Sequence, residues 1–187
     1  MGAMRSPGWL AAMACSALAT QAGATDRATP MAIASSAFAK GGELPSRFTC
    51  EGAGVSPPLA WQGVPSKAKS LALVVSDPDA PDPAAPKRTW THWIVYDLPA
   101  TSAGVPEAMG NALPAGARQG NNDWGRAGYG GACPPIGRHR YIHVLYALDV
   151  ALGDLHAPDR QALERAMKGH VLAQAQLVGT YAKHAVR

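Results

Sequence analysis

The sequence predicts a mainly antiparallel β protein with one helix near its C-terminus. The strand candidates are short runs rich in apolar, β-branched and aromatic residues, at 70–75, 90–97 and 141–148. Turn-forming residues separate these runs, since the chain holds 20 glycines and 16 prolines. One segment, 158–168, shows helical spacing of its apolar residues, so strands dominate the expected fold.

Residues 31–35 are a candidate first strand, and two prolines break the chain before 59–61. The run 70–75 is continuously apolar, which is typical of a strand buried on both faces, and Asp77-Pro78 is expected to stop it. The stretch 99–138 is dominated by Gly, Pro, Asn and Ala, and loops of this length are often functional.

Near the C-terminus, the helix at 158–168 has a proline at its start and Gly169 to end it. Residues 173–182 then alternate between polar and small or apolar side chains, which indicates a closing strand.

Residues 1–24 have the pattern of a secretory signal peptide. Arg5 precedes a run of small apolar residues, and Ala22-Gly23-Ala24 fits a small-x-small cleavage site. The run is shorter than the ~20 residues that span a bilayer, which disfavours a membrane anchor, and little of it precedes Cys15, which disfavours a lipoprotein. The sequence therefore predicts an exported protein, periplasmic or secreted, with 25–187 as a single domain.

The number and distribution of charged residues argue against a nucleic-acid partner. Removing Arg5 from the 17 Lys and Arg residues leaves 16, against 13 Asp and Glu residues. These cations are scattered, with neither a basic run nor interleaved aromatics, so no nucleic-acid partner is expected. No later segment is long and apolar enough to cross a membrane, while attraction to anionic ligands stays open.

Removal of the signal peptide leaves two cysteines, Cys50 and Cys133. An even count in an exported chain favours a disulfide, which would tether the Gly/Pro turn to the loop after Phe48. The alternatives are a metal site and a catalytic thiol. Zinc usually takes four ligands from paired clusters, and neither cysteine has a Cys or His partner nearby in sequence, so no metal is expected there.

Two distant turns carry the ionisable groups of greatest interest. The first holds Asp77 and leads to His92, and the second begins at residue 129 and ends in His139 and Tyr141. Proline fixes its own φ and glycine lets backbone approach closely, so such turns hold polar groups in place. The sequence therefore predicts one preformed pocket, shared by both turns, for a small negatively charged molecule.

Asp77 has two interpretations, a turn former that bonds its own backbone or a carboxylate that orients a histidine. Asp79 is expected to be structural, and Ala80-Pro81 is a candidate cis bond.

His92 is placed by strand alternation on one face with Trp90, Ile94 and Tyr96. An imidazole among such neighbours is more often part of a core than a ligand, although its place near the strand's start brings it within reach of the Asp77 turn.

His139, Tyr141 and His143 also share one face of a strand. The two histidines would be ~13 Å apart, too far for one ion, so a shared metal is rejected. The glycine-rich run 129–131 lacks the Gly-Lys-Ser/Thr of a phosphate loop, although its backbone N–H groups could line an anion pocket. No Gly-x-Ser-x-Gly elbow supports a serine nucleophile.

Six motifs give the chain a resemblance to a known family, and in order and spacing they are specific. They resemble the phosphatidylethanolamine-binding proteins, in particular the bacterial branch named for likeness to Raf kinase inhibitor protein, over about 31–183. The motifs are Ser76-Asp77-Pro78-Asp79-Ala80-Pro81, His92-Trp93, Asn122-Asp123-x-Gly125, Gly128-Tyr129-x-Gly131, Pro134-Pro135-x-Gly137 and His139-Arg140-Tyr141.

The resemblance implies two packed antiparallel sheets with peripheral and C-terminal helices, and an anion pocket at one end. Family members bind phosphate, phosphoryl head groups or acetate there, and no reaction is established for them. Kinase inhibition belongs to cytosolic animal members and is not carried over to an exported chain. By likeness, the ligand-binding residues are Asp77, His92, Gly131 with the backbone up to Cys133, Pro134, His139 and Tyr141. Ile136 departs from the family pattern, since many relatives have a lysine there.

The sequence therefore predicts an exported, non-catalytic protein that binds a small phosphorylated or carboxylate ligand without a cofactor. His139 and His92 would donate hydrogen bonds, Tyr141 would add a hydroxyl, and Asp77 would hold a histidine in register. One alternative is a protein-interaction module, such as a protease inhibitor or signalling modulator, that uses the same pocket. A weak hydrolase built on the Asp/His set is the third.

Overall fold

The structure, a computed structural model, describes residues 1–2, 29–110 and 112–184. The predicted signal peptide therefore lies outside the described residues, apart from its first two, and its boundary stays a prediction. The described chain forms strands of 2 to 12 residues, one 3-10 helix and one α-helix. In order they are β1 (Ala32–Ala34), η1 (Ser46–Phe48), β2 (Leu59–Gln62), β3 (Ser70–Ala80), β4 (Arg88–Pro99), β5 (Gly104–Val105), β6 (Arg118–Gln119), β7 (Arg138–Leu148), α1 (Arg160–Met167) and β8 (Val171–Ala182).

The strands form two antiparallel sheets, which confirms the predicted fold class. One sheet has the order β6-β4-β3-β7-β8 and the other the order β1-β2-β5. Ile33 and Trp61 of the smaller sheet share a buried cluster with Leu73, Trp93 and Leu145 of the larger one. The main core therefore lies between the two sheets.

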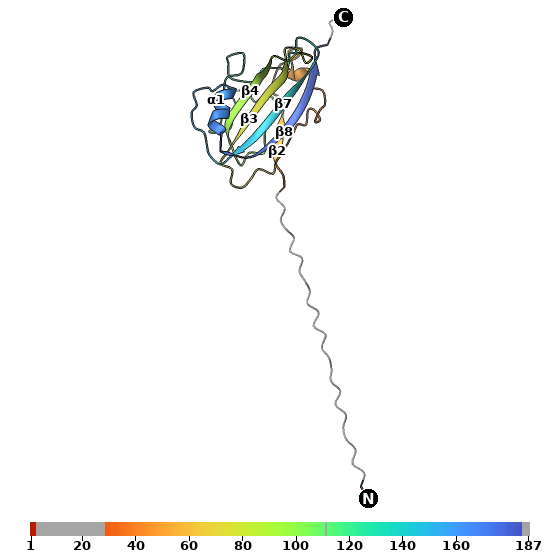
Figure 1. The fold of residues 1–187 in the computed structure, drawn as a ribbon, viewed down its shortest axis with the longest axis vertical. Coiled ribbons are helices and arrows are strands. Elements are labelled where there is room, and N and C mark those ends of the chain that lie inside the picture. Colours follow the sequence, from red (N-terminus) through yellow and green to blue (C-terminus); the bar gives the residue numbers. More distant parts are fainter. Residues whose placement is uncertain (3–28, 111, 185–187) are drawn as a thin grey trace.

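The other face of the larger sheet is covered by α1, which Figure 1 shows beside β3 and β4. Leu163 and Met167 of the helix are buried against Ala72, Val74 and Ile94 of the sheet. Asp159 precedes α1 and its carboxylate accepts the backbone N–H of Ala162 at 2.7 Å, which caps the helix. Within the described ranges, no helix has the length and hydropathy needed to cross a membrane.

β3 is the central strand of the larger sheet, between β4 and β7. Alternate residues from 71 to 75 belong to the two opposite cores. This arrangement confirms the prediction of a strand buried on both faces, because only such a strand needs an unbroken apolar run.

The prediction that Asp77-Pro78 stops this strand is wrong, because β3 continues to Ala80. The ladder between β3 and β7 ends before this point, and the register with β4 shifts between Asp77 and Ala80. A proline is tolerated in a strand where no ladder hydrogen bond needs its N–H. The carboxylate of Asp79 here accepts the backbone N–H of Arg140 in β7 at 2.9 Å, and so continues the connection between the strands.

Other strand boundaries also differ from prediction. β4 and β7 begin at Arg88 and Arg138, and β8 begins at Val171, each earlier than expected. β5 and β6 interrupt the expected loop 99–138. Each has two residues, too short to produce a periodic apolar pattern, so only pairing with longer strands identifies them.

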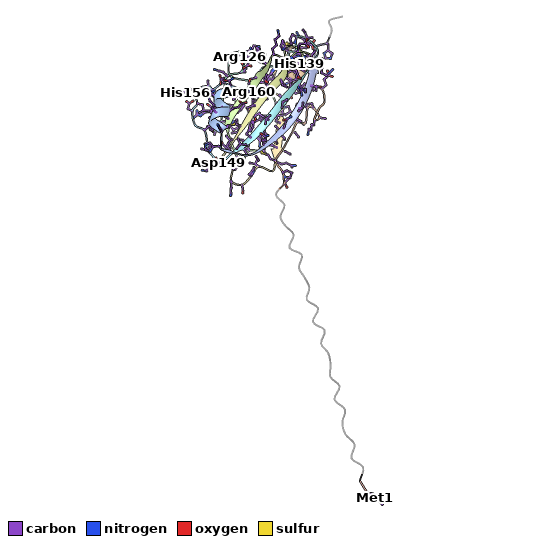
Figure 2. The ribbon with its side chains drawn as sticks, in the orientation of Figure 1. Met1, Arg126, His139, Asp149, His156 and Arg160 are labelled. Carbon is purple, nitrogen blue, oxygen red and sulfur yellow. A yellow bond between two sulfur atoms is a disulfide. The ribbon has the colours of Figure 1, made fainter. Side chains whose placement is uncertain are left out.

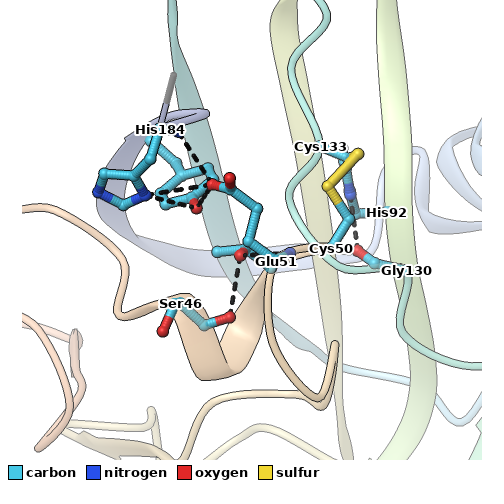
Figure 3. The surroundings of a disulfide bond; sticks show 9 residues. Ser46, Cys50, Glu51, His92, Gly130, Cys133 and His184 are labelled. Atoms are coloured by element: carbon cyan, nitrogen blue, oxygen red, sulfur yellow. Dashed lines mark hydrogen bonds and ion pairs between the residues drawn. A yellow bond between two sulfur atoms is a disulfide. The ribbon is translucent and has the colours of Figure 1, made fainter. Parts of the chain in front are cut away.

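The predicted disulfide between Cys50 and Cys133 is present and closes a sequence separation of 83 residues. A parallel bridge between Thr49 and Ala132 lies beside it, and the N–H of Cys50 donates to the carbonyl of Ala132 at 3.0 Å. The disulfide therefore attaches the Gly/Pro turn before β7 to the segment after η1, as Figure 3 shows.

Replacing both cysteines with serine is expected to lower the free energy of unfolding by about 4 kcal/mol, because a long loop then regains its entropy in the unfolded chain. Denaturant unfolding of the wild type and the double variant measures this difference. A reductant should bring the wild type to the variant's stability, and equal stability of the oxidised wild type and the variant would contradict the prediction.

Candidate functional site

A pocket of about 320 Å³ lies at the end of the larger sheet where β7 begins. Figure 2 labels His139 at this end of the sheet and Asp149 toward the opposite end. The pocket is lined by Asp77, Ala80, Pro81, Trp90, His92, Trp124, Cys133, Pro135 and His139.

Three of the predicted site residues, Asp77, His92 and His139, come together around this pocket. They come from three adjacent strands, β3, β4 and β7. Each is almost fully buried, with exposed fractions of 3%, 3% and 0%. Neighbouring strands lie about 5 Å apart, so the central ladder itself brings the three side chains within reach of one another.

Asp77 combines the two roles that its sequence left open. Its Oδ1 accepts the backbone N–H of Asp79 at 2.8 Å, which is the turn-forming bond. Its Oδ2 contacts Nδ1 of His139 at 2.7 Å, so the same carboxylate orients the imidazole. The Ala80–Pro81 peptide bond that follows is cis, as predicted.

His139 has an acceptor at each ring nitrogen. Its Nδ1 faces the Asp77 carboxylate, and its Nε2 lies 3.0 Å from the carbonyl oxygen of Ile136. A carboxylate and a carbonyl only accept, so both contacts are hydrogen bonds at once only when the ring carries two protons. Both ring nitrogens of His139 therefore face acceptors within the protein, which hold the ring from two sides.

The prediction that His92 shares a face with Ile94 and Tyr96 is wrong. Consecutive β3 residues pair with Trp93 and Thr91, which leaves His92 as an extra residue, a β-bulge, in β4. A bulge interrupts the alternation of side chains. Ile94 and Tyr96 therefore pack under α1, whereas the His92 ring turns to the pocket.

One nitrogen of the His92 ring is bonded within the protein, and the other can contact a ligand in the pocket. Its Nδ1 donates to the carbonyl of Gly130 at 2.7 Å, which leaves Nε2 as the nitrogen that can serve the pocket. Burial lowers the pKa of His92, and the Gly130 bond opposes this shift only in part. At neutral pH the ring is therefore uncharged, and Nε2 presents a lone pair.

Tyr141 packs against the His92 ring and does not line the pocket. The two rings meet edge to face with centroids 5.1 Å apart. The Tyr141 hydroxyl is enclosed and has no partner among the described residues, and burial, followed by the charge of Asp77, raises its pKa. The phenol therefore stays neutral and supports the imidazole from behind.

Gly131 and Pro134 also lie outside the pocket wall, to which their turn contributes Cys133 and Pro135. Gly131 has a packing role, since a Cβ there would lie 3.1 Å from the carbonyl carbon of Thr49. This close approach of two backbones accompanies the disulfide, and Figure 3 shows Cys133 next to the His92–Gly130 bond.

Two lining residues, Trp90 and Trp124, were missed by the sequence analysis. Trp124 occupied the variable position of the Asn122-Asp123-x-Gly125 motif, and its side chain remains 44% exposed. A large indole in a loop rich in Gly and Asn cannot be explained as part of a strand in the core. That mismatch was the available signal.

His143 is not among the residues that line the pocket. His143 lies further along β7, packed against the Phe38 ring with centroids 5.5 Å apart. Its Nδ1 contacts the carbonyl of Tyr141 at 3.2 Å, and its Nε2 is enclosed without a partner among the described residues. Across the described ranges, no three His, Cys, Asp or Glu side chains are placed to hold a metal ion.

A family model described as phosphatidylethanolamine-binding protein matches residues 34–182, which cover both sheets, α1 and the pocket. The chain belongs to the phosphatidylethanolamine-binding protein family. A UPF0098 protein of Methanothermobacter thermautotrophicus is 47% identical over 153 residues, which are 81% of this chain and 98% of that protein.

Solved structures of the family agree with this assignment. A phosphatidylethanolamine-binding protein homologue of Chlamydia trachomatis is 42% identical, with a TM-score of 0.76 over 83% of this chain and 99% of that one. YbcL of Escherichia coli is 33% identical, with a TM-score of 0.76 over 83% and 100% of the two chains. A carboxypeptidase Y inhibitor, complexed with its cognate proteinase, shares the fold at 18% identity and a TM-score of 0.55, over 84% of each chain.

The stability of this family member is expected to fall between about pH 6.5 and pH 4. Burial lowers the pKa of His143 from 6.5 to about 4, so as the pH falls the unfolded chain takes up a proton that the folded chain does not. The stability is complete above pH 6.5, and His143 alone should account for a loss of roughly 3 kcal/mol.

Urea unfolding of the wild type and His143→Gln across this pH range measures the effect as a difference in slope. His156→Gln is the matched control, because the His156 side chain is 89% exposed. Parallel pH profiles of the wild type and His143→Gln would exclude His143 as the cause.

Proposed function

We propose that this protein is an exported, non-catalytic binder of small anions that carry a phosphoryl or carboxylate group. The observation that carries the proposal is the convergence of Asp77, His92 and His139 on one pocket of about 320 Å³. Ligand pockets range from ~300 to ~1,000 Å³, mostly apolar with a few placed polar groups, and this pocket fits that description.

Each of the three side chains has a distinct role in the proposed binding. Asp77 orients the His139 ring, which forms part of the wall against which an anion would lie. His92 offers Nε2, which donates a hydrogen bond once the ring gains a proton. A bound anion favours that charged form, so binding and proton uptake by His92 are coupled.

The lining supports a binding role without chemistry. The lining residues offer no hydroxyl nucleophile, and their one cysteine, Cys133, is in the disulfide. A nucleophile beside the Asp77–His139 pair would be needed for covalent catalysis.

Export is supported by the disulfide. Disulfides persist in oxidising compartments and are rare in the cytosol, and Cys50 and Cys133 are the cysteines that remain after the predicted signal peptide. The disulfide therefore supports the proposal of an exported protein, periplasmic or secreted.

Calorimetric titration with inorganic phosphate tests the site directly. His139→Ala is expected to weaken binding by about 10- to 100-fold, because removal of the ring leaves the Asp77 carboxylate without its partner beside the bound anion, a loss of roughly 1.5–3 kcal/mol. His156→Ala, which removes the exposed histidine labelled far from His139 in Figure 2, should leave the affinity unchanged. Equal phosphate affinity of the wild type and His139→Ala would sink the proposal.

A second titration tests the proton coupling, with sulfate as a phosphate analogue whose charge is constant from about pH 5 to 8. Affinity should rise as the pH falls below the ordinary pKa of histidine, about 6.5, since His92 then charges more easily in the complex. His92→Gln should flatten the profile. A flat wild-type profile would exclude the coupling.

A second candidate function is a protein-interaction module. The observation in its favour is apolar exposure in two loops that reach the pocket, at Ile136, next to the lining residue Pro135, and at Trp124, which are 57% and 44% exposed. A single partner captured equally by the wild type and His139→Ala, but not by Ile136→Asp, would favour this function over anion binding.

A further inference from the structure

We infer that the ligand of this pocket carries an aromatic group beside its anionic one, and that Trp90 and Trp124 bind the ring. This inference rests on the proposed function, because it assigns the anionic group to His92 and to the His139 ring that Asp77 holds. The ligand class is therefore an aryl phosphate or aryl carboxylate rather than a bare oxyanion.

The size and lining of the pocket give the first argument. A volume of about 320 Å³ corresponds to roughly ten water molecules at ~30 Å³ each, more than one phosphate or carboxylate group fills. The space beyond the ionisable groups is bounded by Ala80, Pro81 and Pro135 as well as by the two indoles. An apolar, flat group suits this lining better than a second charged group, which would lose its hydration there.

The two indoles give the second argument. The Trp90 and Trp124 rings meet edge to face, with centroids 5.2 Å apart and planes at 72°. Trp124 meets the His92 ring in the same way, at 5.1 Å and 76°. Aromatic rings prefer such edge-to-face contacts, and a ligand ring next to His92 would extend the series.

The Trp124 loop is built to hold an exposed indole in place. The buried side chain of Asn122 accepts the N–H groups of Trp124 at 3.0 Å and Arg126 at 3.4 Å, and donates to the Gly128 carbonyl at 2.9 Å. Gly130 leaves room for the ring, since a Cβ there would lie 2.2 Å from Cζ3 of Trp124. The loop is thus held in place, and its indole, still 44% exposed, leaves apolar surface available to a ligand.

Arg88 contacts the Trp90 ring and helps to hold it in place. The Arg88 guanidinium lies 4.0 Å from the Trp90 ring centroid and 3.5 Å from the Asp123 carboxylate, which also accepts the Thr91 N–H at 3.0 Å. Both indoles are thus preorganised, which reduces the entropy lost when a ligand ring is bound.

Two tryptophans beside a carboxylate could instead bind an alkylammonium cation. The Asp77 carboxylate, however, is already occupied by His139 and by the Asp79 N–H. A carboxylate with both oxygens in use is a poor partner for a cation, so the aromatic group is expected to belong to an anion.

The experiment is a calorimetric comparison of inorganic phosphate, methyl phosphate, phenyl phosphate and phenyltrimethylammonium on the full mature chain. Phenyl phosphate is expected to bind about five- to tenfold more tightly than methyl phosphate, from one added aromatic contact. Trp124→Ala should reduce this ratio to about one, while Trp124→Phe should keep most of it. Leu172→Ala, which alters an exposed apolar residue outside the pocket lining, is the control that should keep the ratio. Thermal melting checks that each variant is folded.

The outcomes separate the two proposals. Equal affinity for methyl and phenyl phosphate, or an unchanged ratio in folded Trp124→Ala, overturns the aromatic site and leaves anion binding in place. Tighter binding of phenyltrimethylammonium than of phenyl phosphate overturns it in favour of a cation site. The absence of binding by all three phosphates overturns the proposed function and the aromatic site together.

Discussion

The contact between Asp77 and His139 joins the ends of β3 and β7, and the geometry of the pocket depends on it. Both groups are almost fully buried, so removal of one partner would leave the other uncompensated, a change that costs about 3–5 kcal/mol in such pairs. Next to it, the Asp79 carboxylate binds the guanidinium of Arg140 at 2.6 and 2.9 Å. The two carboxylates at the end of β3 thus bind two side chains of β7.

This arrangement requires a strand that is buried on both faces and yet ends in polar residues. The apolar run of β3 anchors it in both cores, while Pro78 follows the point where its ladder with β7 has ended. Side-chain bonds from Asp79 then replace ladder bonds.

The remaining walls of the pocket come from loops that have little apolar content, so covalent and polar contacts hold them. The disulfide fixes Cys133, and the buried amide of Asn122 fixes Trp124. On the far side of the disulfide, the Glu51 carboxylate accepts the backbone N–H of His184 at 3.0 Å, which attaches the end of β8 to the same region (Figure 3). Rigid loops of this kind suit a preformed site.

The sequence by itself determined the sheet-forming runs, the helix before the last strand, the disulfide and the presence of Asp77, His92 and His139 in one pocket. The runs and the helix follow from local periodicity and turn chemistry, which are properties of contiguous residues. The disulfide follows from the even number of cysteines, and the grouping of Asp77, His92 and His139 from the two polar turns and the motifs that resemble the family. Only the tertiary structure decided that His92 leaves the strand alternation, that Tyr141 lies behind the pocket, and that Trp124 forms its wall. A bulge is defined by two strands, and a wall by loops from distant parts of the chain, so neither exists until the chain has folded.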